Sequence, residues 1–187
     1  MIDRLYDQAR EQNATVAYFY FDPAAKKERS PTNVLGAILK QVVRGLEEMP
    51  EEISRAYNDR KSDGRGLELA DILKMLQATT SENPTFICID GIDECLAGYR
   101  VKLLDSLNKV IRGSPGARVF MTGRPQIQAE VERRLSGITM AVHITPRIYD
   151  ITRFLRRRLN EDTTPDAMDS SLEADILKKI PEDISET

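Results

Sequence analysis

Three carboxylates stand directly after a short apolar stretch of this chain. Residues 85–89 read TFICI, and Asp90, Asp93 and Glu94 follow within the segment DGIDEC. A carboxylate that leaves a buried strand is rigidly held and partly desolvated, which suits a hard cation such as Mg²⁺, and a second acid nearby could orient or deprotonate a water molecule. The structural alternative is that these acids cap the next helix and interact with its dipole. The residues alone leave both interpretations open.

An arginine follows the next apolar stretch in the same way. Residues 117–122 read ARVFMT, and Arg124 lies in the turn TGRP that comes next. In a parallel sheet this turn and Asp90 would lie at the same edge, and a guanidinium offers a fixed fork of donors that fits a terminal phosphate. Arg124 could instead form a structural salt bridge with Asp93 or Glu94.

The other reactive or aromatic side chains favour structural roles. His143 is the single histidine, so a place in the core is favoured over a base or a metal ligand. The spacing of Cys88 and Cys95 fits neither a redox pair nor a zinc site, so we expect Cys88 in the core and assign Cys95 no nucleophilic role. The aromatic run 18–21 is expected in the sheet core. The arginines of residues 153–158 favour a solvated helix face over a nucleic-acid patch.

Hydrophobic periodicity predicts the elements that position these residues. Apolar spacings of three and four residues predict helices at about 1–12, 31–46, 50–57, 67–76, 101–113, 127–135, 148–159 and 172–180. Short β-branched, aromatic or apolar runs predict strands at 16–21, 85–89, 117–122 and 138–145. The polar stretches 58–66 and 160–171 predict an exposed loop and a linker.

This alternation of strands and helices predicts an α/β fold with a parallel sheet and right-handed crossovers. Ligands of such sheets bind beyond the carboxyl ends of the strands. Asp90 and Arg124 both follow predicted strands directly, so the sequence predicts a binding site that contains these two residues.

Composition and charge exclude several classes of protein. A chain of 187 residues has the length of one ordinary domain. Its 27 basic and 30 acidic side chains leave a net charge of −3, so no global positive field favours nucleic-acid binding. The longest apolar run, residues 16–21, is far shorter than the ~20 residues of a membrane-spanning helix, and residues 1–10 lack a secretory pattern. We expect a cytoplasmic protein with no membrane or nucleic-acid partner.

Three segments together resemble the NACHT-type P-loop NTPases of signal transduction. Within that group the likeness is to fungal NLR-like proteins, which are also described as nephrocystin-like N-terminal domains. Residues 86–95, FICIDGIDEC, resemble their Walker B segment, and residues 119–125, VFMTGRP, look like their sensor-1 strand and turn. Residues 16–42 resemble the strand and helix that precede Walker B. The similarity covers residues 1–160.

The resemblance implies a three-layer, P-loop NTPase-like sheet with flanking helices that binds nucleotide, with Mg²⁺ and ATP or GTP as cofactors. It implies that Asp90 helps to hold the metal ion through a coordinated water. Asp93 would orient the attacking water, with Glu94 as the second candidate. Arg124 would bind the nucleotide and sense its γ-phosphate. Phosphoryl transfer depends mainly on such positioning and charge neutralisation.

The phosphate-binding loop of that class is missing from the sequence. Its motif GxxxxGK[ST] cradles the phosphates with backbone N–H groups and a lysine, yet none of the 10 glycines is followed by lysine. The resemblance places the loop before the helix at 1–12, and its strand between the strands of Val119 and Val142. We therefore expect a fragment or a decayed relative that lacks the first strand and leaves residues 138–145 unpaired.

Two functional hypotheses follow. The first is a truncated NACHT-like core at residues 1–160, followed at 161–187 by a linker and the start of a helical region. Such a chain would bind nucleotide weakly or not at all, would not hydrolyse it alone, and would meet protein partners through flanking domains. The alternative is a non-catalytic protein-interaction domain with a degenerate nucleotide site.

Overall fold

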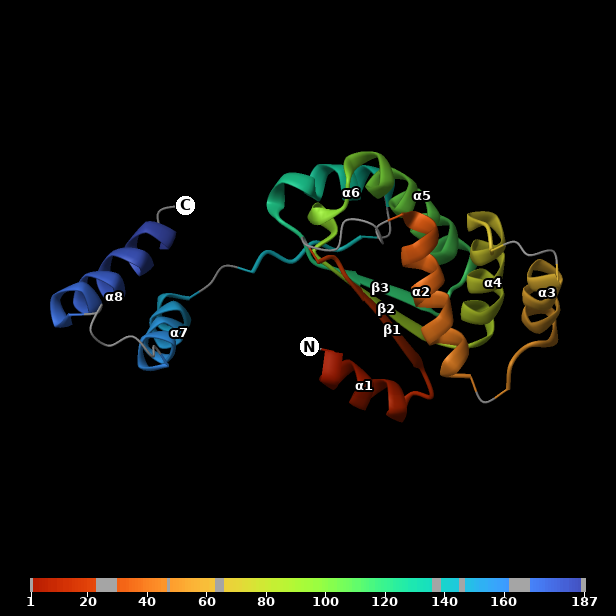
Figure 1. Cartoon of the computed structure of the whole chain (residues 1–187), viewed down its shortest axis with the longest axis horizontal. Helices are drawn as coiled ribbons and strands as arrows, with labels where there is room; N and C mark the ends of the chain where they lie inside the picture. Colours follow the sequence, from red (N-terminus) through yellow and green to blue (C-terminus); the bar gives the residue numbers. More distant parts are fainter. Residues whose placement is uncertain are drawn as a thin grey trace. The chain divides into compact units, whose positions relative to one another are not determined.

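The structure is a computed structural model whose contacts divide the chain into two compact units, residues 1–139 and residues 140–187 (Figure 1). It describes residues 2–22, 30–46, 48–62, 66–135, 139–144, 147–161 and 169–185.

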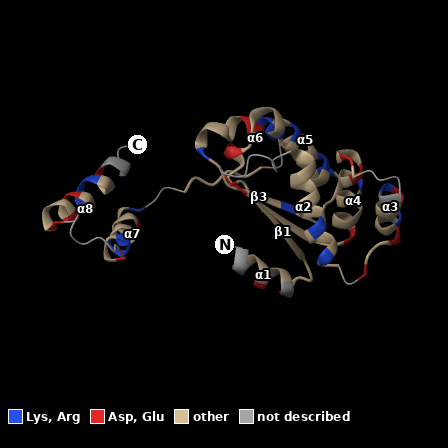
Figure 2. Cartoon of the chain, in the orientation of Figure 1, with Lys and Arg blue, Asp and Glu red and all other residues tan. Residues whose placement is uncertain are grey.

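A three-stranded parallel sheet forms the centre of the first unit. Its strands are β1 (Thr15–Tyr20), β2 (Thr85–Asp90) and β3 (Ala117–Met121), in the order β1-β2-β3. Thr85 is the register partner of Thr15 on one side and of Ala117 on the other. The strands carry almost no charged residues (Figure 2). The predicted α/β fold with a parallel sheet is therefore confirmed.

Helices and 3-10 turns surround this sheet. In chain order they are α1 (Ile2–Glu11), α2 (Pro31–Arg44), α3 (Glu51–Ser62), α4 (Leu69–Glu82), η2 (Ile92–Glu94), α5 (Ala97–Gly113), η3 (Pro125–Ile127) and α6 (Gln128–Arg134). Helix α2 begins as the sequence predicts, because the Ser30 side chain accepts a hydrogen bond from the Asn33 N–H at 3.2 Å and Pro31 occupies the first turn.

The predicted loop at 58–66 is wrong in its first half, because α3 continues to Ser62. Polar residues do not by themselves end a helix, because their side chains can face solvent while the backbone hydrogen bonds continue. Ile53 is buried in the core, and Arg55 pairs with Glu51 one turn earlier at 3.1 Å. Arg60 forms an ion pair of 2.7 Å with Asp71 at the start of α4. Residues 63–65 lie outside the described part of the chain.

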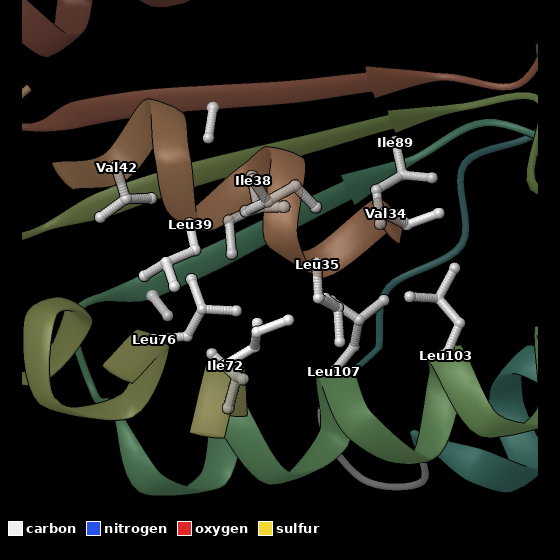
Figure 3. Close-up of a cluster of buried hydrophobic side chains, with 14 of the residues drawn as sticks. Val34, Leu35, Ile38, Leu39, Val42, Ile72, Leu76, Ile89, Leu103 and Leu107 are labelled. Carbon is white, nitrogen blue, oxygen red and sulfur yellow. The ribbon is translucent and has the colours of Figure 1, made fainter. Parts of the chain in front are cut away.

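The hydrophobic core lies between one face of the sheet and helices α2, α4 and α5 (Figure 3). Side chains of α2 point toward those of α4 and α5 and toward β2. Among the largest fully buried ones are Leu35, Ile38, Leu76, Ile87, Ile89, Leu103 and Leu107. Each such side chain stabilises the fold by about 1.5–3 kcal/mol relative to its exposure to water. This core holds the ends of β2 and β3 in fixed positions.

The other face of the sheet is only partly covered. Helix α1 contacts β1 and β2, where Val16 and Cys88 are buried, which confirms Cys88 as a core residue. Tyr18, Tyr20 and Phe120 are 37%, 52% and 41% exposed. The prediction that the aromatic run 18–21 lies wholly in the core is therefore wrong. Side chains alternate along a strand, and only Phe19 and Phe21 of this run lie on the face covered by α2.

Residues 139–144, predicted to belong to a strand, form no strand in the structure. Met140, Val142 and Ile144 are 88%, 71% and 89% exposed, and His143 is exposed instead of lying in the core. The alternating pattern is that of a strand, but a strand forms only when a neighbour takes up its backbone hydrogen bonds. No described strand pairs with these residues. Ile138 and Thr145 lie outside the described residues.

The second unit contains two helices that pack against each other, α7 (Ile148–Asn160) and α8 (Ser170–Ser185). Contacts place α7 in the same unit as α8, whereas the sequence predicts a first domain that extends to residue 160. The predicted boundary at residue 160 stays a prediction. Pro181 lies inside α8 and is buried. The arginines of α7 are exposed, as predicted, and Arg157 pairs with Glu161 at 2.8 Å. Residues 162–168 of the predicted linker lie outside the described part.

No helix among the described residues is long and apolar enough to cross a membrane.

Candidate functional site

Asp90 ends β2, and its side chain is exposed where the strand leaves the core. Ile87 and Ile89 anchor the strand in the core, and the Asp90 carbonyl accepts a hydrogen bond of 3.0 Å from the Phe21 N–H beyond β1. The exposed carboxylate therefore stands on a rigid support. This is the position that the sequence predicts for a metal-binding or phosphate-facing acid.

Thr122 joins the ends of β2 and β3. Its hydroxyl donates a hydrogen bond to Asp90 Oδ1 and accepts one of 3.0 Å from the Gly91 N–H. Its backbone N–H donates to the Ile89 carbonyl at 3.0 Å, and its carbonyl accepts from the Ile92 N–H at 3.0 Å. Thr122 thus fixes both the direction of the Asp90 carboxylate and the path of the turn that follows.

Gly91 and Gly123 allow the two turns to approach each other. Gly91 has φ of 70°, the left-handed region in which a side chain is strained. At Gly123 a Cβ atom would lie 2.8 Å from Ile127 Cδ1 and 3.0 Å from Ile92 Cγ2. A side chain at Gly123 would therefore force Ile127 or Ile92 to shift. Both glycines keep the acids of η2 next to the turn of Arg124.

Arg124 forms ion pairs with both acids of η2. Its Nε lies 3.4 Å from Asp93 Oδ2, and its Nη2 lies 3.3 Å from Glu94 Oε1. The Asp93 side chain is 7% exposed, whereas that of Arg124 is 67% exposed. Of the two interpretations that the sequence leaves open, the structure contains the salt bridge. A cluster at the carboxyl ends of β2 and β3 thus contains Asp90, Asp93, Glu94, Thr122 and Arg124. We call this cluster the strand-end site.

Arg100 of α5, which the sequence pattern does not single out, holds the backbone of the strand-end site. Its Nη1 donates to the carbonyls of Asp93 at 3.3 Å and Cys95 at 2.9 Å, and its Nε pairs with Glu130 of α6 at 2.9 Å. The side chains of Arg100 and Glu130 are only 13% and 19% exposed. An arginine placed one turn after the acidic segment is the only signal that the sequence offers for this role.

Cys95 and Cys88 take no visible part in chemistry at the site. Both are buried and form no disulfide. Burial raises the pKa of the Cys88 thiol, which keeps it in the unreactive protonated form.

The carboxylates of the strand-end site fit Mg²⁺ only as a metal ion that is also held by phosphates and water. Among the described residues, no group of three or more His, Cys, Asp or Glu side chains could hold a metal ion. Mg²⁺ is, however, commonly bound by one or two carboxylates together with substrate phosphates and water, and the exposed Asp90 carboxylate fits that mode. The donor set therefore suits a metal ion that arrives with a nucleotide.

Comparison with known proteins finds one family, Nephrocystin 3, N-terminal, which matches residues 1–124. The match covers the whole sheet and ends at Arg124, so it includes the strand-end site. No curated protein and no solved structure matches the chain.

Proposed function

The chain belongs to the family Nephrocystin 3, N-terminal, and on that premise we propose that it is part of a NACHT-like signal-transduction NTPase module. In this proposal residues 86–95 are a Walker B segment of the P-loop NTPase class, and residues 119–125 are a sensor-1 segment. Residues 1–187 contain no phosphate-binding loop, so the chain by itself does not hydrolyse nucleotide. One observation carries the proposal: Asp90 at the end of β2 and Arg124 in the turn after β3 lie together at the carboxyl ends of two adjacent strands.

Asp90 is the residue that would hold Mg²⁺, through a coordinated water. What supports this role is an exposed carboxylate whose Oδ1 is oriented by Thr122. When bound, Mg²⁺ bridges phosphate oxygens of ATP or GTP and neutralises their charge. Asp93, held by Arg124 and nearly buried, would orient a water molecule, and Glu94 is the more exposed second candidate.

Arg124 is the residue that would contact the terminal phosphate. It now pairs with Asp93 and Glu94, so a phosphate would have to replace a carboxylate as its partner. The pair with Glu94 is accessible to water, and such ion pairs contribute only about 0–1 kcal/mol. Such an exchange is therefore energetically small, and a phosphate offers the same geometry of oxygen acceptors.

The same proposal covers location and partners. We infer a cytoplasmic module whose protein partners bind through domains that flank the NTPase core in longer relatives. The net charge of −3 supports a protein that does not depend on nucleic acid.

Nucleotide binding and turnover by the purified 187-residue chain test this function. We expect no ATP or GTP turnover, and weak binding of a fluorescent ATP analogue that needs Mg²⁺ and is lost in Asp90→Asn. A matched control is Asp105→Asn, because Asp105 is an exposed acid on α5 that pairs with Arg134. Turnover at ordinary NTPase rates that Asp90→Ala abolishes would contradict the absence of hydrolysis.

A non-catalytic interaction domain is the second candidate function. The observation that favours it is that the polar groups of the strand-end site bond to one another: Thr122 with Asp90, and Arg124 with both acids of η2. This candidate predicts that MgATP leaves the melting temperature of the wild type unchanged. An increase in the wild type that is absent in Asp90→Asn would reject it.

A further inference from the structure

A pocket lies beside the start of β1, between α1 and α2, the two helices that contact this strand (Figure 1). Helix α1 contributes Tyr6 to its lining, and the second half of α2 contributes Lys40 and Arg44. Its volume is about 640 Å³. Pockets that bind small molecules measure roughly 300–1,000 Å³. The pocket therefore has room for an organic molecule and not only for an inorganic ion.

This pocket is separate from the parts of the first unit that the proposed function uses. Its lining includes Ala14 and Thr15 at the amino end of β1, whereas the strand-end site lies at the carboxyl ends of β2 and β3. The NACHT resemblance places the phosphate-loop strand beside β3, and β1 forms the opposite edge of the sheet. The walls of the pocket therefore do not depend on that strand.

Both charged residues in the described lining of the pocket are cations. Lys40 and Arg44 lie four residues apart on α2, so they share one face of the helix. No described aspartate or glutamate lines the pocket, and neither cation forms an ion pair within the described part of the chain. The whole chain has a net charge of −3, so this local excess of positive charge is not a general property of its surface. A negatively charged ligand is the kind that this lining attracts.

Two tyrosines also line the pocket, Tyr6 of α1 and Tyr18 of β1. They are 39% and 37% exposed, so neither ring is wholly enclosed by protein. Burial, together with the neighbouring Tyr18, raises the pKa of the Tyr6 hydroxyl, which therefore keeps its proton and can donate a hydrogen bond. Tyrosine combines an apolar ring with a polar tip, so these side chains suit a ligand that has both an apolar body and a polar group.

The backbone of Val16 offers the pocket a further donor. The Thr15 N–H donates to the Pro84 carbonyl of the neighbouring strand at 2.9 Å, so the backbone groups of the next residue, Val16, and those of Tyr18 point outward. The Gln41 amide bonds to the N–H and the carbonyl of Tyr18, at 3.1 Å and 2.8 Å. No hydrogen bond between described residues reaches the outward groups of Val16, which lines the pocket and is only 6% exposed. Buried backbone N–H groups are nearly always paired in proteins, so this one is available to a ligand.

We propose that this pocket binds a small organic anion, in which a phosphate or carboxylate group is attached to an apolar or aromatic body. The guanidinium of Arg44 and the ammonium of Lys40 bind the anionic group, and the Tyr6 hydroxyl is a further donor to it. The body of the ligand packs against the tyrosine rings. This binding needs neither Mg²⁺ nor the strand-end site, so it is independent of the proposed nucleotide function.

Arg44 also has a structural role that the experiment must separate from binding. It lies in the last turn of α2, where a cation stabilises the helix dipole. Loss of that role lowers the melting temperature of the free protein and leaves no mark on the affinity for an anion. Affinity and melting temperature, measured on the same variants, therefore distinguish the two roles.

Titration of the chain with phenyl phosphate in the absence of Mg²⁺, followed by the chemical shifts of its backbone amides, tests the site. We expect saturable shifts at Val16 and Tyr18, with a Kd on the order of millimolar because the probe has few atoms. Benzoate tests the carboxylate form of the same chemistry, and saturable binding of either probe at these amides supports the proposal. Benzyl alcohol lacks the charge and inorganic phosphate lacks the body, so each should bind at least roughly fivefold more weakly.

Three outcomes of this titration would overturn the proposal. The first is the absence of saturable shifts with both phenyl phosphate and benzoate. The second is equal affinity for benzyl alcohol or for inorganic phosphate, which would reject an organic anion as the ligand class. The third is a set of shifts that gathers at Gly91 and Gly123 instead, because these residues belong to the turns of the strand-end site.

Single variants then locate the binding. Lys40→Gln and Arg44→Gln should each weaken phenyl phosphate binding roughly fivefold or more, because each removes a charged donor to the anion. Lys74→Gln and Arg133→Gln are matched controls, since they remove exposed cations on α4 and α6, and they should leave the affinity unchanged. Equal losses in the controls would reveal a general effect of charge and refute the site. So would an Arg44→Gln variant that melts at a lower temperature but keeps the affinity of the wild type.

Discussion

The hydroxyl of Thr122 donates a hydrogen bond to the carboxylate of Asp90 and ties the end of β3 to the end of β2. The same oxygen accepts from the Gly91 N–H at 3.0 Å, so one small side chain orients the acid and fixes the turn. Neighbouring parallel strands bring two segments about 30 residues apart in sequence into this contact.

Thr122→Val keeps the shape of the side chain and removes its hydroxyl. We expect a loss of about 0.5–1.5 kcal/mol in the free energy of unfolding, because an exposed hydrogen-bonded pair contributes a modest amount. Urea denaturation measures it. Thr122→Ser retains the hydroxyl and should restore most of the loss; equal destabilisation by both variants would show that the methyl group, and not the hydrogen bond, matters.

Gly91→Ala should destabilise the chain by roughly 1–2 kcal/mol, because an alanine at φ of 70° is strained. The matched control is Gly98→Ala, in the first turn of α5, where a Cβ atom meets nothing within 4 Å. Alanine is the better helix former, so the control should be neutral or slightly stabilising. Thermal melting of both variants makes the comparison, and a neutral Gly91→Ala would show that the turn can relax.

Arg100→Met should be among the most destabilising single changes near the site, with a loss of about 3 kcal/mol. It leaves the nearly buried Glu130 without its partner and removes two hydrogen bonds to backbone carbonyls. Adding Glu130→Gln should recover part of the loss, because the unpaired charge is then gone. Chemical denaturation of the single and double variants measures this coupling; an additive double variant would mean that the pair contributes little.

Arg124→Ala should reduce stability by about 1–3 kcal/mol, because Asp93, whose side chain is 7% exposed, loses its ion-pair partner. Under the proposed function it should also weaken Mg²⁺-dependent nucleotide binding. Arg55→Ala is a suitable control, because Arg55 is equally exposed and also pairs with a glutamate, on α3 and away from the strand-end site. Titration of a fluorescent nucleotide into both variants distinguishes a local effect from a general loss of positive charge.

Cys88 should make the fold sensitive to alkaline pH. Burial raises the pKa of its thiol above the unfolded value, so the folded state holds its proton more tightly than the unfolded state. Stability is then greatest below the unfolded pKa and falls as the pH rises through and above about 9. Urea denaturation at several pH values should give a smaller decline for Cys88→Ala than for the wild type. Parallel declines would assign the alkaline loss to other groups.

Local sequence patterns predicted most of the elements of the first unit. The apolar stretches that became β2 and β3, and the spacing of α2 and α5, needed no knowledge of their neighbours, because buried strands and amphipathic helices are marked by their own periodicity. The predicted loop at 58–66 is wrong in its first half because polar residues alone do not end a helix. The strand at 138–145 failed at its described residues because a strand also needs a partner.

The sequence by itself determined that acids and an arginine follow two neighbouring strands, since residue type and order along the chain are local properties. Only the tertiary structure decided that Thr122 holds Asp90, that Arg124 pairs with the acids of η2, and that Arg100 supports their backbone. It alone also showed that the side-chain amide of Gln41 bonds to the backbone of Tyr18 at the edge of the sheet formed by β1. These are contacts between segments far apart in the chain, and their geometry depends on how the helices pack on the sheet.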